Sequence, residues 1–254
     1  MQKTMRMPGD NAMPTISIVT ITLNEEKNLP ALFASLRAQT DRDFAFIVMD
    51  GASKDGTMAL LQGAGDLVTQ CASEPDFGFY DALNKAVRQV RTDYYLVLGA
   101  DDTLAPDAVA NFKASAAAGD VDLVIAAVDA DGRILRGYHP EKRWLGPPAM
   151  YTSHSVGTLI RTALHQRFGY YSFKYAIFGD SLFVKKVMIA PGTRVIEGDF
   201  VAGIFCTQGF SAADLVRSTC ELWMVQRETG ENRLLQFLLF QLRLLRNLRR
   251  ILTR

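Results

Sequence analysis

Three apolar runs in the first hundred residues each end next to acidic side chains. The runs cover residues 16–23, 44–49 and 94–100. Between the first two, residues 29–36 repeat leucine and phenylalanine at the spacing of one helix face. Strands that alternate with helices over short connections indicate parallel strands joined by right-handed crossovers. The sequence therefore predicts an α/β protein with a mostly parallel sheet flanked by helices.

The polar residues after these runs are predicted to meet at one edge of the sheet. They are Asn24 and Glu25 after the first run, Asp50 after the second, and Asp101 and Asp102 after the third. Neighbouring parallel strands share the edge formed by their carboxyl ends, where open α/β sheets bind ligands. Any one of these residues is better explained as a helix cap. Three successive strand ends of this kind favour a ligand-binding edge.

The adjacent carboxylates of Asp101 and Asp102 are costly at the mouth of a buried strand, because they repel each other and lose hydration there. A cation would offset this cost, and a hard divalent metal ion is the leading candidate. The alternative is a turn in which Asp102 caps a helix that begins near Pro106 while Asp101 is solvated.

The composition is that of an ordinary globular protein. The chain has 254 residues, 48% of them apolar and 22% charged, which is enough for one large domain or two fused halves. Residues 231–254 hold six arginines and one glutamate, a net charge of +5 in a chain whose total is +1. The body is therefore acidic and the tail basic. The total charge does not favour nucleic acid as a partner.

Several features predict a cytoplasmic protein. The three cysteines have neither disulfide-framework nor zinc-ligand spacing, which favours reduced thiols. Residues 1–13 lack the apolar core of a signal peptide, so we expect residues 1–15 to form a loose extension. No run approaches the roughly 20 apolar residues that cross a bilayer.

The second half of the chain is less regular than the first. Residues 121–128 are predicted to form a strand, and residues 133–139 pair with a neighbour. A helix is expected over 180–188, and short strands within 195–206. Helices resume after residue 212. This pattern indicates that the first half is an α/β nucleotide-binding unit. A mixed second half is joined to it without a clear linker.

Four segments resemble motifs of glycosyltransferase family 2. They are residues 18–25, 50–57, 74–85 and 99–102, and they occur in the order found in that family. The resemblance continues more loosely to about residue 211. It implies the GT-A fold and inverting transfer of a sugar from a nucleoside diphosphate donor.

The resemblance also divides the chain. It implies a catalytic domain over residues 16–211, with a nucleotide-binding half over 16–102 and a mixed acceptor half over 103–211. A helical region with a basic amphipathic tail would follow over 212–254. The sheet would be Rossmann-like, mostly parallel and flanked by helices.

The resemblance places one group of residues around the donor: Thr20, Thr22, Asn24, Glu25, Asp50, Asp76, Lys85 and Asp101. Glu25 would accept hydrogen bonds from the ribose, and Asp50 from a uracil-like base, since a carboxylate only accepts. Asp101 would lie near the ribose. Asp102 would bind Mn²⁺ or Mg²⁺, which neutralises the leaving diphosphate. Lys85 would be a second cation or a solvated charge on its helix.

An inverting transferase also needs a base that deprotonates the incoming hydroxyl. The family places an aspartate at the start of a helix in the second half, and Asp180 falls there. The alternative for Asp180 is a helix N-cap, and Asp76 is the rival carboxylate. The resemblance offers three further candidates near the site, His154, Gly209 and Ser211, although a lone histidine is more often structural and residues 208–211 could be a plain turn.

The tail has two explanations. From residue 234 to 252 nearly every position that is not leucine is arginine, glutamine, phenylalanine or asparagine, and Arg243, Arg246 and Arg250 lie on one helical side. A basic amphipathic helix can lie in an anionic membrane interface, which would hold the protein on the inner face of a membrane. It can equally pack its leucines onto the body or a second protomer. We favour the membrane narrowly, and no nucleic-acid motif accompanies the arginines.

The predicted function is transfer of one sugar, with a UDP-sugar as the favoured donor, to a hydroxyl of a saccharide or lipid-linked saccharide in polysaccharide or glycolipid synthesis. Two other functions fit parts of the pattern. A sugar nucleotidyltransferase would carry a glycine-rich loop after the first strand, where residues 22–25 read Thr-Leu-Asn-Glu. A non-catalytic, membrane-associated binder of nucleotide sugars would keep the same carboxylates.

Overall fold

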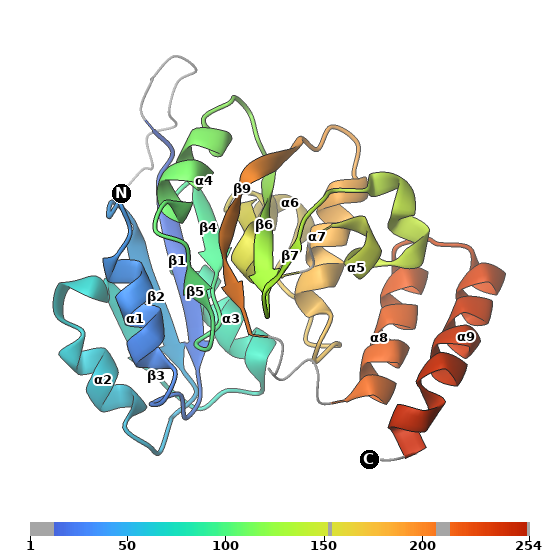
Figure 1. The fold of residues 1–254 in the computed structure, drawn as a ribbon, viewed down its shortest axis with the longest axis horizontal. Coiled ribbons are helices and arrows are strands. Elements are labelled where there is room, and N and C mark those ends of the chain that lie inside the picture. Colours follow the sequence, from blue (N-terminus) through green and yellow to red (C-terminus); the bar gives the residue numbers. More distant parts are fainter. Residues whose placement is uncertain (1–12, 152–153, 207–213, 253–254) are drawn as a thin grey trace.

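The computed structural model describes residues 13–151, 154–206 and 214–252. Within them one mixed sheet of nine strands runs through the molecule in the order β3-β2-β1-β4-β8-β6-β9-β5, with β7 paired to β6 (Figure 1). The strands are β1 Ile16–Thr22, β2 Ala45–Asp50, β3 Gln70–Ser73, β4 Tyr94–Val97, β5 Thr103–Leu104, β6 Leu123–Ala130, β7 Arg133–Leu135, β8 Thr158–Arg161 and β9 Val195–Phe205.

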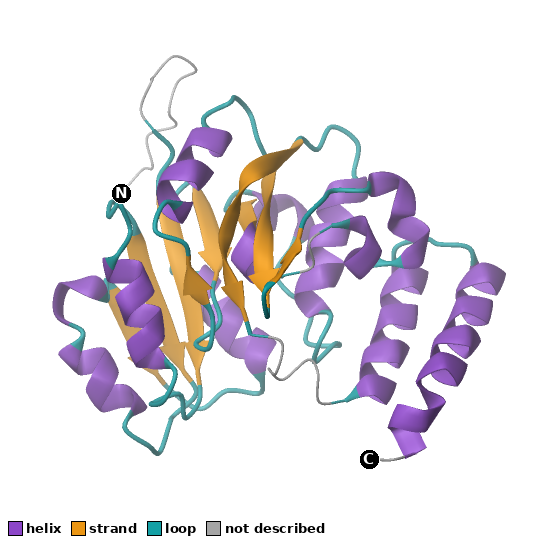
Figure 2. Cartoon of the chain, viewed as in Figure 1, coloured by secondary structure: helices purple, strands orange, loops and turns teal. Residues whose placement is uncertain are grey.

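Helices cover both faces of this sheet, and two more form a hairpin beyond it (Figure 2). The α-helices are α1 Leu29–Arg37, α2 Thr57–Gly63, α3 Phe79–Val87, α4 Ala108–Ala116, α5 Pro147–Met150, α6 Leu164–Phe168, α7 Gly179–Ile189, α8 Leu215–Glu228 and α9 Arg233–Leu252. Three short 3₁₀ helices cover Gly65–Leu67, Pro140–Leu145 and Ser155–Gly157.

Strand β1 is buried on both faces, which explains its continuous apolar sequence. Ile16 and Ile18 pack into a core with α1, α2 and α4. Val19 points to the other face and packs into a core with α3, α6 and α7. Both β2 and β4 run parallel to β1, as the sequence predicts.

The second half of the sheet mixes directions. Strand β8 is antiparallel to both β4 and β6, whereas β9 is parallel to β6. The predicted strand over 121–128 corresponds to β6, and Arg133–Leu135 pairs with it as β7. The expectation of short separate strands within 195–206 is wrong. A single strand, β9, covers this segment and shifts register against β6 instead of ending.

The hairpin of α8 and α9 is attached to the body through two buried charged residues. Glu221 of α8 accepts hydrogen bonds from the backbone N–H groups of Ala176, Ile177 and Phe178. Lys185 of α7 is fully buried, and its ammonium binds Gln226 of α8. Because removing one partner of a buried charge is costly, these contacts fix the hairpin to α7. In the described part of the chain no helix is long and apolar enough to span a membrane.

Gly203 allows the close pairing of β9 with β5, and replacing it should destabilise the protein. A Cβ at this position would lie 2.0 Å from the backbone oxygen of Thr103, so Gly203→Ala must displace β5. We expect the free energy of unfolding in urea to fall by about 2 kcal/mol or more. Gly63→Ala is the matched control, because a Cβ there meets no atom within 4 Å. Equal stability of the two variants would contradict the close contact.

Candidate active site

The carboxyl ends of β1, β2 and β4 lie side by side and bring the predicted donor residues to one edge. Thr22 is the register partner of Asp50 across β1 and β2, and its hydroxyl donates to Asp50 Oδ1 at 3.0 Å. Glu25 follows in the turn after β1, and the negative charge of Asp101 after β4 helps to raise its pKa. The predicted convergence of these strand ends is therefore present.

Asp50 is fully buried, and the chain itself occupies its carboxylate. Oδ1 accepts from the hydroxyls of Thr22 and Ser53, and Oδ2 from the Ser73 hydroxyl and the Ser53 N–H. Burial alone would raise the pKa of Asp50, but hydrogen bonds from Ser53, Ser73 and Thr22 lower it below its ordinary value. Asp50 would accept a bond from a base only if one of these internal bonds opened.

Thr20 and Asn24 also bind the protein itself. The buried Thr20 hydroxyl donates to the backbone oxygen of Leu98 at 2.9 Å and so links β1 to β4. Asn24 adopts a left-handed backbone conformation with φ 58°, and its side-chain oxygen accepts from the Lys54 N–H. Both residues shape the edge rather than project from it.

Glu25 is half-buried in this turn. Its Oε2 accepts from the side-chain amide of Asn28 at 2.7 Å. Burial raises the pKa of Glu25, and the carboxylates of Asp101 and Asp55 add to this effect. The edge therefore carries a concentration of negative charge that favours a bound cation.

The two adjacent aspartates differ in burial. Asp102 is 3% exposed, and its Oδ1 and Oδ2 accept from the N–H groups of Cys206 and Gly99 at 2.9 and 3.1 Å. Burial and the neighbouring Asp101 raise its pKa to about 6. Asp101 is exposed. The helix-cap alternative for Asp102 is wrong, because Asp107 occupies the N-cap position of α4.

Gly99 gives the two carboxylates room. A Cβ on Gly99 would lie 2.6 Å from Asp102 Oδ2 and 2.8 Å from Asp101 Oδ1. Both side chains therefore fold over the glycine, and a larger residue there would push them apart. This cradle of carboxylate oxygens suits a hard divalent cation such as Mn²⁺ or Mg²⁺. Among the described residues no cluster of three or more acidic, histidine or cysteine side chains could hold such an ion.

Asp76 and Lys85 belong to the segment that leads into α3. Asp76 Oδ1 accepts from the Gly78 N–H, and a Cβ on Gly51 would lie 2.5 Å from its Oδ2. Lys85 pairs with Glu74 at 2.8 Å and with Asp81 at 3.0 Å, and these partners raise its pKa. Lys85 is thus neither a simply solvated charge nor an unpaired cation beside the donor.

Asp180 lies in the first turn of α7, and Phe178 rather than Asp180 takes the N-cap position. Its Oδ1 accepts from the Tyr80 hydroxyl at 2.8 Å and from the Ser181 N–H at 2.7 Å. A Cβ on Gly179 would lie within 2.9 Å of the Tyr80 ring, so the glycine lets Tyr80 reach the carboxylate. Burial raises the pKa of Asp180 above its ordinary value.

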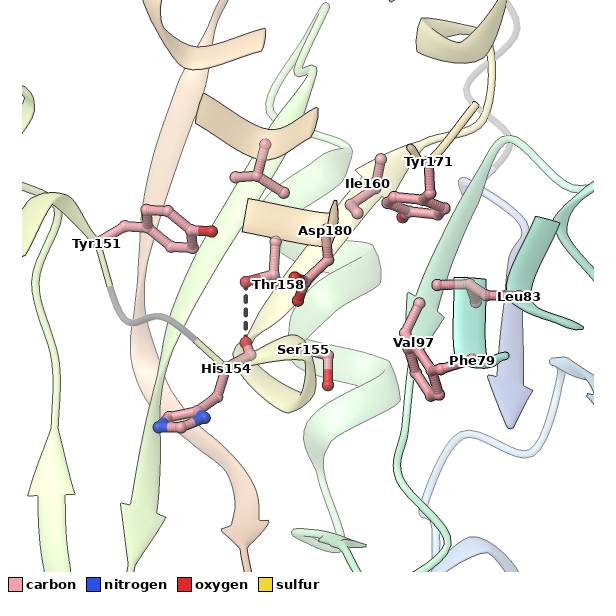
Figure 3. Close-up of a pocket in the computed structure, with 11 residues that line it drawn as sticks. Phe79, Leu83, Val97, Tyr151, His154, Ser155, Thr158, Ile160, Tyr171 and Asp180 are labelled. Carbon is pink, nitrogen blue, oxygen red and sulfur yellow. Dashed lines mark hydrogen bonds between the residues drawn. The ribbon is translucent and has the colours of Figure 1, made fainter. Parts of the chain in front are cut away.

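A pocket opens beside Asp180, beyond the end of β4 (Figure 3). Its lining comes from α3, β4, β8, α7 and the loops between them: Phe79, Leu83, Val97, Tyr151, His154, Ser155, Thr158, Ile160, Tyr171, Asp180 and Val184. The lining is mostly apolar, with one carboxylate. A site of this kind fits a small ligand that needs a single polar group to orient it.

His154 lines this pocket, as the sequence suggests, but its ring packs against another aromatic ring. The imidazole stacks on Phe205 with ring centroids 3.4 Å apart. Burial lowers the pKa of His154 to about 4, so the ring is neutral near pH 7. The two candidates that the sequence offered beside His154, namely Gly209 and Ser211, lie outside the described residues.

Two residues that bind near the candidate base, Tyr80 and Glu221, were not predicted from the sequence. Tyr80 lies inside one of the resembling segments, but its partner Asp180 is 100 positions away along the chain. Glu221 has no motif around it, and only the fold shows that it binds the loop before α7. No local signal could have identified either contact.

The model of the family "Glycosyl transferase family 2" matches residues 17–188, which include most of β1 and most of α7. The chain belongs to this family. The match includes every candidate site residue from Thr20 to Asp180.

Curated relatives of this family 2 chain are glycosyltransferases by name. An uncharacterised glycosyltransferase of Mycobacterium tuberculosis is 38% identical over 99 residues, which is 38% of each chain. A PGL/p-HBAD biosynthesis glycosyltransferase of Mycobacterium bovis is 36% identical over 97 residues, 37% of this chain and 38% of the relative. The matched region thus spans little more than a third of the length of these relatives.

Solved structures establish the GT-A fold. TarS of S. aureus in complex with UDP-GlcNAc superimposes with a TM-score of 0.65 at 16% identity, covering 92% of this chain and 72% of that one. A mannosyltransferase of Pyrobaculum calidifontis in complex with GDP-Man and Mn²⁺ gives 0.66 at 20% identity, covering 85% and 64%. At these identities the likeness concerns the fold, and it agrees with the fold that the sequence predicts.

Protonation of His154 should destabilise the protein in acid. Its folded-state pKa of about 4 lies below the ordinary 6.5, so the unfolded state binds more protons between these values. Stability is therefore lost as the pH falls through 6.5 toward 4, by about 2 kcal/mol between pH 7 and pH 5. His154→Phe should remove this part of the pH dependence in urea unfolding. His139→Phe, which replaces a half-buried histidine outside this pocket, should keep it. Parallel curves for all three proteins would contradict the assignment.

Proposed function

We propose that this chain transfers one sugar from a nucleoside diphosphate sugar to an acceptor hydroxyl with inversion at the transferred carbon. The observation that carries the proposal is the position of Asp180. Its carboxylate lines a pocket just beyond the end of β4, whose next residues include the acidic pair. A donor held at the strand edge and an acceptor held in the pocket would meet there.

Asp180 acts as the general base in this proposal. Its Oδ1 is held by Tyr80 and Ser181, which leaves Oδ2 to accept the proton of the incoming hydroxyl. Burial raises its pKa, which makes the ionised carboxylate a stronger base than that of an exposed aspartate. The carboxylate is ionised when the pH exceeds this raised pKa. As the acceptor oxygen bonds to the sugar carbon from one side, the bond to the diphosphate breaks on the other, which inverts that centre.

The metal contact is better assigned to Asp101 than to Asp102, the reverse of the roles expected from the sequence. Both oxygens of Asp102 already accept backbone N–H groups, whereas Asp101 is exposed beside Glu25. Mg²⁺ and similar ions commonly take one or two carboxylates from the protein and their remaining ligands from phosphate and water. When bound, such an ion would neutralise charge on the departing diphosphate. Asp102 would keep Asp101 in place.

Related proteins support a proposal for the donor and the acceptor. Complexes of S. aureus TarS with UDP-GlcNAc and with UDP support a uridine donor, although the Pyrobaculum mannosyltransferase holds GDP-Man. The mycobacterial relative named for PGL/p-HBAD biosynthesis supports an acceptor in glycolipid synthesis. We extend both to this chain as proposals: a UDP-sugar donor and a saccharide or lipid-linked saccharide acceptor, used at the cytoplasmic face of a membrane.

Replacing the base should abolish transfer without abolishing donor binding. Asp180→Asn keeps the size of the side chain but cannot take a proton, so we expect turnover to fall by about 100-fold or more. The affinity for UDP, measured by calorimetry, should stay near that of the unchanged protein. In the unchanged protein kcat/KM should rise with pH as Asp180 ionises, and Asp180→Asn should lack this limb. Substantial transfer by Asp180→Asn would move the role to Asp76.

Two variants separate the roles of the acidic pair. Asp101→Asn should weaken Mn²⁺-dependent binding of UDP by about tenfold or more and leave thermal stability unchanged. Asp102→Asn loses one of two acceptors for buried N–H groups, so stability should fall by about 1–3 kcal/mol. Asp66→Asn is the matched control for loss of one exposed negative charge. If Asp102→Asn alone loses the metal dependence and remains stable, the metal contact belongs to Asp102.

The same measurements address the two alternative functions. A non-catalytic nucleotide-sugar binder would bind UDP with Mn²⁺ and show no turnover in any variant. A sugar nucleotidyltransferase would release pyrophosphate from a nucleoside triphosphate and a sugar phosphate, which a coupled phosphate assay detects.

A further inference from the structure

Helix α9 turns apolar side chains outward. Leu234, Leu238, Leu242 and Leu245 are 68%, 56%, 61% and 67% exposed. Their spacing of three and four residues places them in one row along the helix, which we call the leucine stripe. Further exposed apolar residues border it: Leu235, Phe237 and Leu248. A continuous apolar surface of this kind on a globular protein marks a place where something else binds.

Two polar side chains of α9, Gln236 and Arg243, bind the protein instead. Gln236 is fully buried and donates to the backbone oxygen of Trp144 at 2.7 Å. Arg243 donates to the backbone oxygen of Leu145 at 2.7 Å. These contacts set the rotation of the helix, so the leucine stripe cannot turn inward without breaking them. The exposure of the stripe is therefore fixed by the fold.

The charge of α9 indicates what covers the leucine stripe. The helix from Arg233 to Leu252 contains five arginines and no acidic residue. Arg233 and Arg246 are exposed, and Arg246 lies one turn beyond Leu242. Long arginine side chains can reach from an apolar boundary to nearby anionic groups. An apolar row on a helix whose only charged residues are arginines matches an anionic lipid surface.

A second copy of the chain is a poorer match. Two α9 helices placed stripe against stripe would bring their exposed arginines together, with no carboxylate on either helix to pair with them. Like charges at such an interface oppose association. Head groups of an anionic bilayer supply the missing negative charge.

The position of α9 relative to the site also fits a lipid surface. Its carboxyl-terminal end points to the same side of the molecule as the carboxyl ends of β1 and β2 (Figure 1). Its partner α8 holds the loop before Asp180 through Glu221. A bilayer that covered α9 would therefore run parallel to the direction in which β1 and β2 end. The sheet edge with the candidate site would then face along the bilayer.

We propose that α9 lies along an anionic lipid bilayer, with the leucine stripe in the apolar boundary and its arginines among the head groups. The helix binds the surface and does not cross it. Docking of this kind is independent of nucleotide chemistry, so it stands or falls separately from the proposed transferase.

Vesicle flotation with the full chain tests the proposal. The protein should float with vesicles of phosphatidylcholine mixed with phosphatidylglycerol, and much less with phosphatidylcholine alone. Leu238→Gln, Leu242→Gln and Leu245→Gln together should weaken this binding by about tenfold or more. The matched control combines Ile134→Gln and Phe173→Gln, which remove exposed apolar side chains elsewhere and should float normally.

The arginines are tested separately. Arg233→Gln with Arg246→Gln should weaken binding to the anionic vesicles by about tenfold or more, and added salt should act in the same direction. All these side chains are exposed, so thermal unfolding and UDP affinity should match those of the unchanged chain. That result shows that a loss of flotation is not a loss of folding.

Three outcomes would overturn the proposal. The unchanged chain fails to float with anionic vesicles, it floats equally well with neutral ones, or the triple leucine variant floats as before. A dimer in sedimentation that the leucine variant dissociates, without vesicle binding, would assign the stripe to a second copy.

Discussion

The parallel pairing of β1 with β2 on one side and β4 on the other is the interaction on which the site depends. Both faces of β1 are buried, so each neighbour is fixed in register by packing as well as by backbone hydrogen bonds. The carboxyl ends of the three strands therefore fall at one edge. Glu25 and Asp101 come from different turns and still influence each other there.

Single side chains connect this edge to the second half of the molecule. Asp102 follows β4 but accepts from the N–H of Cys206 after β9, and Tyr80 of α3 binds Asp180 of α7. The first contact joins the acidic pair to the far part of the sheet. The second joins α3 to the proposed base. The two halves are thus joined by buried polar contacts at the place where the proposed substrates would meet.

Sequence patterns predicted the parts of the fold that have a long or regular signal. The apolar runs were sufficient to predict β1, β2 and β6, and the leucine spacing was sufficient to predict α1. Strands β5 and β8 have only two and four residues, too few for a period to emerge. Which aspartate of the acidic pair turns inward could not be predicted, because it depends on an N–H 104 positions away. The ion pairs that occupy Lys85 are equally a product of folding.

Glu221 has a consequence for where the folded unit ends. Its carboxylate satisfies three consecutive N–H groups immediately before α7, and these donors would otherwise lie without partners in a partly buried loop. A chain shortened before α8 would leave the segment that leads to Asp180 without its anchor. The hairpin is therefore part of the scaffold that shapes the pocket beside Asp180, and a force applied to α8 from outside acts on the three residues that immediately precede α7.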